Sequence, residues 1–355
     1  MSSAFTLTID WLAFTVPESS PRETAQLLES DWSKDKGGFR GYPLSWIWSE
    51  GQRGIGRLGT GALRCPREVH IDLSAGIVST WAGEKVRRVL QWVREKQGHV
   101  TRIDCALDDR ANLVPLSTIR EAVRNGQCLT RATRMQVIES GLIHEQAKIG
   151  ETLYFGSPRS QTLLRIYDKR LELQAKQRDE WQDYGIRWEL ELKKDRANLS
   201  AACLGMLEEA DWREFVVGLL RSYVDFRDTT RDEEEDLRYR APLLPWYAEL
   251  TEGFKKGRLM IEKEEPSLPK VKAWIVDSVA PMLAVICAAP NGQAWLEREI
   301  VIAVDRWKDR HRNLLKKPKA TSTNRSAGGN AGAQSQGDQG EVAKRPPEDA
   351  DAPHD

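Results

Sequence analysis

Three short segments of the chain place charged or hydroxyl-bearing side chains at every second position. The segments are 102–108 (RIDCALD), 165–169 (RIYDK) and 187–192 (RWELEL). Alternate side chains of an extended strand point to the same side of a sheet, so each segment would present one polar and one apolar face. The polar sets are Arg102, Asp104 and Asp108; Arg165, Tyr167 and Lys169; and Arg187, Glu189 and Glu191.

If these three strands are neighbours, their polar side chains form a set that suits phosphoryl transfer. Carboxylate oxygens are hard ligands for Mg²⁺ or Mn²⁺, and such an ion would polarise a phosphodiester. Tyr167 would attack the phosphorus, while Arg165 or Lys169 would offset the developing charge. Because a phenol with its usual pKa of about 10 is a weak nucleophile at neutral pH, a nearby cation is expected to favour the phenolate.

A plainer interpretation of the same pattern is a solvated sheet face whose charges pair across the strands. Such ion pairs alone would account for Arg102, Arg187 and Glu189. Periodicity therefore leaves open whether this face is a site or a surface.

Other motifs compete with this assignment. Tyr154 and Tyr184 are rival nucleophiles, but neither has both an arginine and a lysine beside it as Tyr167 does. His70 and Asp72 share a strand face and could bind a metal, with an ordinary exposed strand as the alternative. The glycines of 54–61 fit GxGxxG, but a strand follows them, which predicts a glycine-rich hairpin rather than a dinucleotide site.

Composition sets the class of protein without naming its partner. Lysine plus arginine and aspartate plus glutamate number 53 each, yet a basic groove can lie within a neutral total because phosphate contacts depend on local charge. Five cysteines without CxxC spacing argue against structural zinc and a disulfide framework. Thirteen tryptophans are expected mainly in the core, although aromatic faces also stack on unpaired bases. The absence of a long apolar run or a signal peptide predicts a cytoplasmic protein.

Strand and helix patterns alternate around the three segments. Strands are expected at 5–16, 69–74, 100–107 and 186–192, with a hairpin from 152–155 and 162–169. Helices are expected from Ser20 to about Trp32, around 86–93, at 116–124 and over much of 197–228. This order predicts an α+β fold with a mixed or mainly antiparallel sheet and helices mainly on one face.

Charge and complexity change after residue 230. A catalytic domain is predicted for 1–230 and a charged linker for 231–245, which begins with RDEEED. Helical stretches around 271–287 and 294–315 predict a small helical domain over 246–315. The segment 316–355 is nearly free of aliphatic and aromatic residues and is predicted to be disordered.

Five segments together resemble the replication initiation factor family, in the family's order across about residues 5–230. This family includes rolling-circle initiators of plasmids and filamentous phages and related relaxases of integrative elements. The most specific combination is LRIYDK after a Tyr-Phe-Gly-Ser hairpin and before RWELEL. The segments are 9–12 (IDWL), 101–108 (TRIDCALD), 152–157 (TLYFGS), 164–169 (LRIYDK) and 187–192 (RWELEL).

The resemblance implies a nicking domain related to the His-hydrophobe-His endonucleases, in which Tyr167 becomes linked to a 5′ DNA end. The free 3′ hydroxyl would then prime the host polymerase. One departure is that no two histidines are separated by a single residue. The roles implied are metal binding by Asp104 and Glu189, then Asp108 and Glu191; support of the nucleophile by Arg165 and Lys169; and DNA contact by Arg102 and Arg187.

The function expected is therefore a metal-dependent nickase that initiates rolling-circle replication at an origin. A conjugative relaxase with the same chemistry, a non-catalytic DNA-binding regulator and a hydrolase without covalent attachment are the alternatives. The expected partners are single-stranded or supercoiled origin DNA, host replication proteins such as a helicase, and a second copy of the chain in a homodimer. The C-terminal helices would read duplex sequence or recruit such partners.

Overall fold

A computed structural model describes residues 5–50, 54–143, 147–229, 238–257, 259 and 267–315. The chain divides into two compact units, residues 1–262 and 263–355. Each unit is described by itself below.

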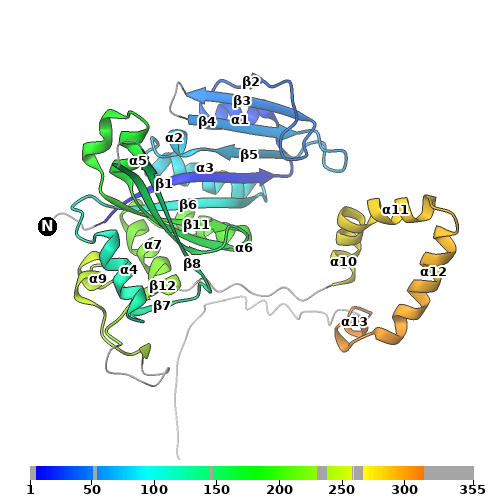
Figure 1. The fold of residues 1–355 in the computed structure, drawn as a ribbon. Coiled ribbons are helices and arrows are strands. Elements are labelled where there is room, and N and C mark those ends of the chain that lie inside the picture. Colours follow the sequence, from blue (N-terminus) through cyan, green and yellow to red (C-terminus); the bar gives the residue numbers. More distant parts are fainter. Residues whose placement is uncertain are drawn as a thin grey trace, which may run out of the picture. The chain divides into compact units, whose positions relative to one another are not determined.

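A ten-stranded antiparallel sheet forms the centre of the first unit (Figure 1). The strand order is β2-β3-β4-β5-β1-β6-β11-β10-β9-β8, while β7 and β12 form a separate pair. This arrangement confirms the predicted α+β class. The strands are β1 Phe5–Val16, β2 Ser33–Lys34, β3 Leu44–Glu50, β4 Gly54–Thr60, β5 Val69–Leu73, β6 His99–Asp109, β7 Cys128–Thr130, β8 Met135–Leu142, β9 Ala147–Gly156, β10 Thr162–Asp168, β11 Ile186–Lys193 and β12 Val224–Phe226.

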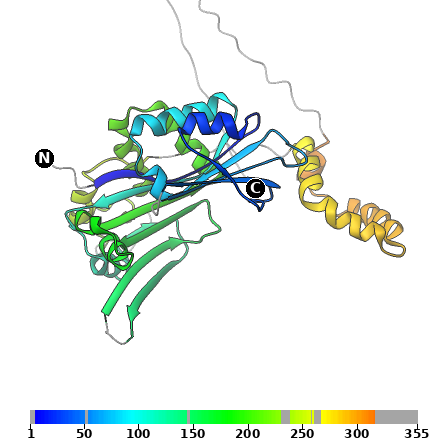
Figure 2. The same ribbon diagram turned by 90° about the horizontal axis from the view of Figure 1, so that it is seen from above.

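Helices cover mainly one face of this sheet, and Figure 2 shows α1 and α3 side by side along it. Helices α3 and α6 contact each other and both contact β6. The core lies between these helices and the sheet. The helices of this unit are α1 Pro21–Leu28, α2 Ala75–Val78, α3 Gly83–Glu95, α4 Leu116–Arg124, α5 Lys169–Ala175, α6 Lys194–Met206, α7 Glu209–Tyr223 and α9 Pro245–Leu250, with a 3₁₀ turn at Asp179–Asp183.

Strand alternation explains which side chains enter the core. Ile103, Cys105 and Leu107 of β6 are fully buried in the apolar cluster, as a period of two requires. On β11, Trp188 packs edge-on against the ring of Phe5 from β1. The alternate residues of these strands, such as Asp104 on β6 and Glu189 on β11, point to the other side of the sheet. This side is called the polar face below.

The first unit extends further along the chain than the sequence predicts. Tyr247 and Leu250 of α9 are fully buried in the core, and the Tyr247 hydroxyl donates a hydrogen bond to the Val224 carbonyl at 2.9 Å. A helical domain beginning at residue 246 is therefore wrong, because α9 packs against β12. The linker prediction is wrong for 238–245, where Ala241 and Leu244 are buried. Residues 230–237 of the linker and the predicted tail 316–355 lie outside the described residues.

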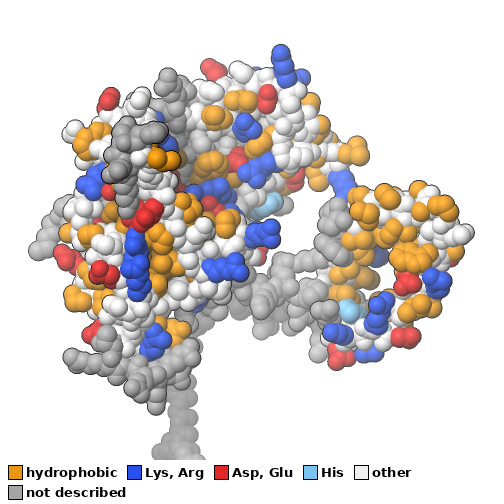
Figure 3. Space-filling view, in the orientation of Figure 1, with side chains coloured by type: hydrophobic (Ala, Val, Ile, Leu, Met, Phe, Trp, Pro, Cys, Tyr) orange, Lys and Arg blue, Asp and Glu red, His pale blue; other side chains and the backbone are white. Residues whose placement is uncertain are grey.

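The second unit is helical where the structure describes it. The predicted stretch around 271–287 is confirmed, whereas the one around 294–315 is broken by a 3₁₀ turn at Val304–Arg306. Figure 3 shows hydrophobic side chains over much of its surface. Over residues 5–315, gaps aside, no helix combines the length and apolarity that a membrane span requires. The helical segments are α10 Leu268–Trp274, a π-helical turn Ile275–Val279, α11 Ala280–Ala288, α12 Gly292–Ala303 and α13 Asp309–Asn313.

Candidate active site

The three polar segments are neighbours in the sheet, as β6, β11 and β10. Arg165 lies directly across from Glu189, and Glu191 lies directly across from Asp104. Residues that pair across antiparallel strands point to the same face. The predicted gathering on one face is therefore confirmed for the side chains on these strands, whereas Lys169 lies outside them, in α5 (Lys169–Ala175).

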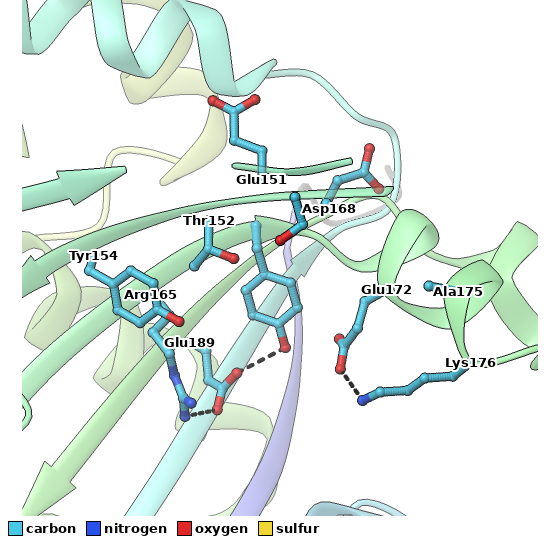
Figure 4. Close-up of a pocket in the computed structure, with 12 residues that line it drawn as sticks. Glu151, Thr152, Tyr154, Arg165, Asp168, Glu172, Ala175, Lys176 and Glu189 are labelled. Carbon is cyan, nitrogen blue, oxygen red and sulfur yellow. Dashed lines mark hydrogen bonds and ion pairs between the residues drawn. The ribbon is translucent and has the colours of Figure 1, made fainter. Parts of the chain in front are cut away.

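The carboxylate of Glu189 accepts hydrogen bonds from both the phenol of Tyr167 and the guanidinium of Arg165. The hydroxyl of Tyr167 donates a hydrogen bond to Glu189 Oε2 at 2.9 Å, and Arg165 Nη2 donates one to Glu189 Oε1 at 2.5 Å (Figure 4). Burial, followed by the charge of Glu189, raises the pKa of Tyr167 well above its usual value. The phenol is thus a protonated donor beside a carboxylate that can take its proton.

This geometry corrects the expectation that cations would favour the phenolate. The ammonium of Lys169 lies 5.7 Å from the centre of the Tyr167 ring and pairs with Glu172 at 2.7 Å. Lys169 begins α5 and does not end the strand, because the Asp168 carboxylate accepts hydrogen bonds from the first backbone N–H groups of that helix. Glu172 was not singled out from sequence, since its approach to Lys169 depends on this helix.

Three carboxylates surround one nitrogen of Arg165. Its Nη2 lies 2.5 Å from Glu189, 3.1 Å from Asp104 and 3.4 Å from Glu191. Arg102 pairs with Asp104 at 2.6 Å and with Glu191 at 3.0 Å. Burial raises the pKa of Asp104 to about 7, although Arg102 acts in the opposite direction. Lys193 also pairs with Glu191, so three largely buried carboxylates face three cationic side chains, those of Arg102, Arg165 and Lys193.

The donor set of this cluster is suited in kind to a hard divalent cation. Three of the four predicted ligands, Asp104, Glu189 and Glu191, come together around one point. The guanidinium of Arg165 is at that point. Among the described residues, no three acidic, histidine or cysteine side chains are already arranged to hold a metal ion. An ion would therefore have to replace the contacts of Arg165.

The fourth predicted ligand belongs to a separate buried network. Asp108 accepts hydrogen bonds from Arg187 Nε at 2.7 Å and Nη2 at 2.9 Å, and Asp10 accepts one from Nη1 at 2.9 Å. Arg187 is only 3% exposed. The structure thus places a predicted DNA contact beneath the surface, whereas Arg102 keeps 23% of its side chain exposed.

Asp10 was not found from sequence as a site residue. The pairing of β1 with β6 shifts between Ile9 and Trp11, so β1 carries a bulge there. A bulge adds one residue and interrupts the alternation of faces. Asp10 and Trp11 consequently both reach the polar face, and the only sequence signal was their place in the IDWL segment.

A pocket of about 380 Å³ opens beside Tyr167. Figure 4 shows Arg165 and Glu189 on its floor, with residues of α5 on one side and of β9 on the other. Tyr154, a rival nucleophile, lines it across from Arg165. The remaining wall residues are Ser140, Gly150, Glu151, Thr152, Asp168, Glu172, Ala175 and Lys176.

The histidine considered as a metal ligand is buried. His70 lies 2.9 Å from the Thr15 hydroxyl and stacks against the rings of Phe39 and Tyr42. Asp72 is engaged by Trp11 Nε1 and by Arg40, each at 2.5 Å. Both residues are 6% exposed, so an exposed strand is wrong, and their partners hold them apart from the carboxylate cluster.

His70 predicts a specific loss of stability in acid. Burial and the charge of Arg40 lower the pKa of His70 from 6.5 to about 4. Between pH 6.5 and pH 4 this histidine is therefore protonated in the unfolded chain and neutral in the folded chain. The free energy of unfolding should fall by up to about 1.4 kcal/mol per pH unit as pH drops from 6.5 toward 4. Urea denaturation at pH 7, 5.5 and 4.5 should show a shallower fall for His70→Gln than for wild type. An unchanged slope, or the same change in the exposed control His99→Gln, would contradict this assignment.

Comparison with known proteins identifies the family of the chain. A family model described as replication initiation factor matches residues 98–300, more than half of the chain. The chain belongs to the replication initiation factor family. The matched range contains β6, β10 and β11, and so includes the cluster around Tyr167.

Two relatives agree with this membership of the replication initiation factor family. The chain is 24% identical over 223 residues to "Putative DNA relaxase NicK" of Bacillus subtilis (strain 168), and the match covers 62% of each chain. It therefore spans less than two thirds of that relative's length. The fold is similar to that of a rolling circle replication initiator protein from Geobacillus stearothermophilus, with a TM-score of 0.58 and 21% identity over 72% of this chain and 100% of that chain.

Proposed function

We propose that this protein initiates rolling-circle replication by nicking one DNA strand at an origin and becoming linked to it through Tyr167. The observation that carries this proposal is the hydrogen bond from the Tyr167 hydroxyl to Glu189 at the edge of an open pocket. Membership of the replication initiation factor family supports it.

The side chains around Tyr167 supply the parts of a transesterification. The phenol oxygen attacks the phosphorus and gives its proton to Glu189, and the bond from phosphorus to the 3′ oxygen breaks. The departing 3′ oxygen takes up a proton and becomes a free hydroxyl, while the 5′ phosphate remains on the tyrosine. Arg165 and Lys169 place positive charge where the phosphoryl oxygens gain negative charge. Incubation with supercoiled DNA carrying the protein's own locus should give relaxed circles and protein-linked 5′ ends.

Mg²⁺ or Mn²⁺ is the cofactor we propose for this reaction. Asp104, Glu189 and Glu191 would hold it, and when bound it would polarise the scissile phosphodiester. Asp108 is less suited, because it lies outside this group of carboxylates, in the buried network around Arg187.

This ligand set predicts that Asp104→Asn weakens Mn²⁺ binding at least about tenfold, about 1.4 kcal/mol. Removing one charged oxygen donor lowers the attraction for a hard cation. The measurement is titration of Mn²⁺ into the full-length protein without DNA, followed by electron paramagnetic resonance. Glu172→Gln, which removes an acidic side chain outside the carboxylate cluster, should bind as wild type. Equal affinity in wild type and Asp104→Asn would exclude this set.

A conjugative relaxase is the second candidate, and the similarity to NicK favours it. Its chemistry would be the same, so the location of the nick on the mobile element decides between the two. Host helicase recruitment, a homodimer and a cytoplasmic location remain predictions that accompany this proposal. A regulator without activity would bind the locus and never nick it.

A further inference from the structure

A second pocket, of about 500 Å³, lies elsewhere on the polar face of the first unit. Its volume is typical of pockets that bind small ligands. It is built by β1, β4, β5 and the loop before β3, all of which precede the residues matched by the family model. The residues used below are Trp11, Phe39, Arg40, Ile55, Arg57 and Asp72.

Two aromatic rings of this pocket are held in fixed positions. The indole of Trp11 donates its only hydrogen bond to Asp72 at 2.5 Å, and the guanidinium of Arg102 lies 4.5 Å from its ring centre. Phe39 stacks against the buried ring of His70, with ring centres 6.0 Å apart. Rings that are already fixed lose little freedom when a flat ligand stacks on them. This wall is therefore suited to a nucleobase.

The same pocket carries positive charge. The guanidinium carbons of Arg40 and Arg57 lie 5.5 and 5.7 Å from the centre of the Phe39 ring. Arg40 pairs with Asp72 at 2.5 Å, whereas the exposed Arg57 forms no ion pair with any of the residues that the structure describes. Arg57 is thus available for a phosphate. Basic groups beside aromatic faces are the combination that binds single-stranded nucleic acid.

A chain of contacts connects this pocket to Tyr167 across the polar face. Trp11 touches Arg102, Arg102 pairs with Asp104, and Asp104 pairs with Arg165. Arg165 and Tyr167 in turn both bind Glu189. Three strand steps separate Trp11 on β1 from Tyr167 on β10, about 15 Å at the usual strand spacing, and five steps separate Arg57 on β4 from Tyr167, about 24 Å. Figure 3 shows basic and acidic side chains together over this part of the first unit. One DNA strand lying along the face could therefore occupy both pockets.

We infer that this second pocket binds an unpaired nucleotide of the nicked strand, with its base against Phe39 and Trp11 and its phosphate at Arg57. The inference rests on the proposed function, because it requires a DNA strand on the polar face. A base enters such a pocket only when it leaves the stack, so the pocket selects single-stranded over duplex DNA.

The test is fluorescence anisotropy of the full-length protein with a labelled thymidine oligonucleotide and with a duplex of equal length, at several salt concentrations. Phe39→Leu, which keeps the apolar bulk and removes the aromatic face, should lower affinity for the single strand about tenfold and leave duplex binding unchanged. Arg57→Gln should reduce the slope of log affinity against log salt by about 0.7, the contribution of one phosphate contact. Arg88→Gln, which removes an exposed charge from α3, should change neither quantity.

The inference would be overturned if Phe39→Leu bound the single strand with the affinity of wild type. It would also be overturned if the substitution lowered the affinities for single strand and duplex equally. If Phe39→Leu does not fold, judged by near-ultraviolet circular dichroism, the exposed Arg57→Gln decides alone, and an unchanged salt slope overturns it. The result is separable from the proposed function, since binding is measured without nicking. If nicking turned out not to depend on Tyr167, these binding measurements would still confirm or overturn the inference about the pocket.

Discussion

Tyr167→Phe is expected to abolish nicking and covalent attachment, by a factor on the order of 10³ or more, while DNA binding stays within about twofold. The substitution removes only the phenol oxygen, which is the nucleophile, and keeps the ring that packs in the pocket. Glu189 keeps its contact with Arg165, so the rest of the cluster remains paired. Gel analysis of supercoiled DNA carrying the protein's own locus, with Mg²⁺ or Mn²⁺, measures nicking.

The matched control is Tyr154→Phe, because Tyr154 lines the same pocket from β9. It should nick at a rate close to that of wild type. Nicking by Tyr167→Phe at the wild-type rate would disprove the assignment of Tyr167 as the nucleophile. Loss of nicking in Tyr154→Phe alone would instead identify Tyr154 as the nucleophile. A cut strand with a free 5′ phosphate and no attached protein would indicate hydrolysis instead.

Arg187→Met is expected to lower the free energy of unfolding by about 3–5 kcal/mol, because it leaves two buried carboxylates without their partner. Asp10 and Asp108 are 7% and 1% exposed, so water cannot replace the guanidinium. Guanidinium chloride denaturation followed by circular dichroism measures the loss. Adding Asp108→Asn to Arg187→Met should recover part of it, since the second change removes one of the unpaired charges.

Arg102→Met gives the comparison for a partly exposed arginine of the same face, and its loss of stability should be smaller. The burial of Arg187 makes it a positioning residue that orders β1, β6 and β11. If Arg187→Met were as stable as wild type but bound DNA with a smaller salt slope, the sequence prediction of a DNA contact would be right.

The sequence by itself determined which side chains could share a face. Side-chain direction along a strand is a local property of the backbone, so the alternation in 102–108, 165–167 and 187–192 was sufficient to group the polar residues. It failed for Lys169, which begins helix α5. The strand Phe5–Val16 and the helix Leu116–Arg124 were also predicted with their observed bounds. Hydrophobic periodicity fixes such elements without reference to the rest of the chain.

The sequence could not determine which of these polar groups are buried and which partner each one has. Arg187 and Asp10 are 177 positions apart, and they meet only because a bulge in β1 turns Asp10 toward the polar face. The high pKa of Tyr167 likewise arises from burial and from Glu189 on the neighbouring strand.

Two further features were decided only by packing. Helix α9 joins the first unit because Tyr247 fits against β12, although its position after a charged segment suggested a separate domain. The second pocket combines Trp11, Phe39 and Arg57 from three parts of the chain. Burial, ion pairing and pocket shape depend on contacts between residues distant in sequence, and a linear pattern contains no information on those distances.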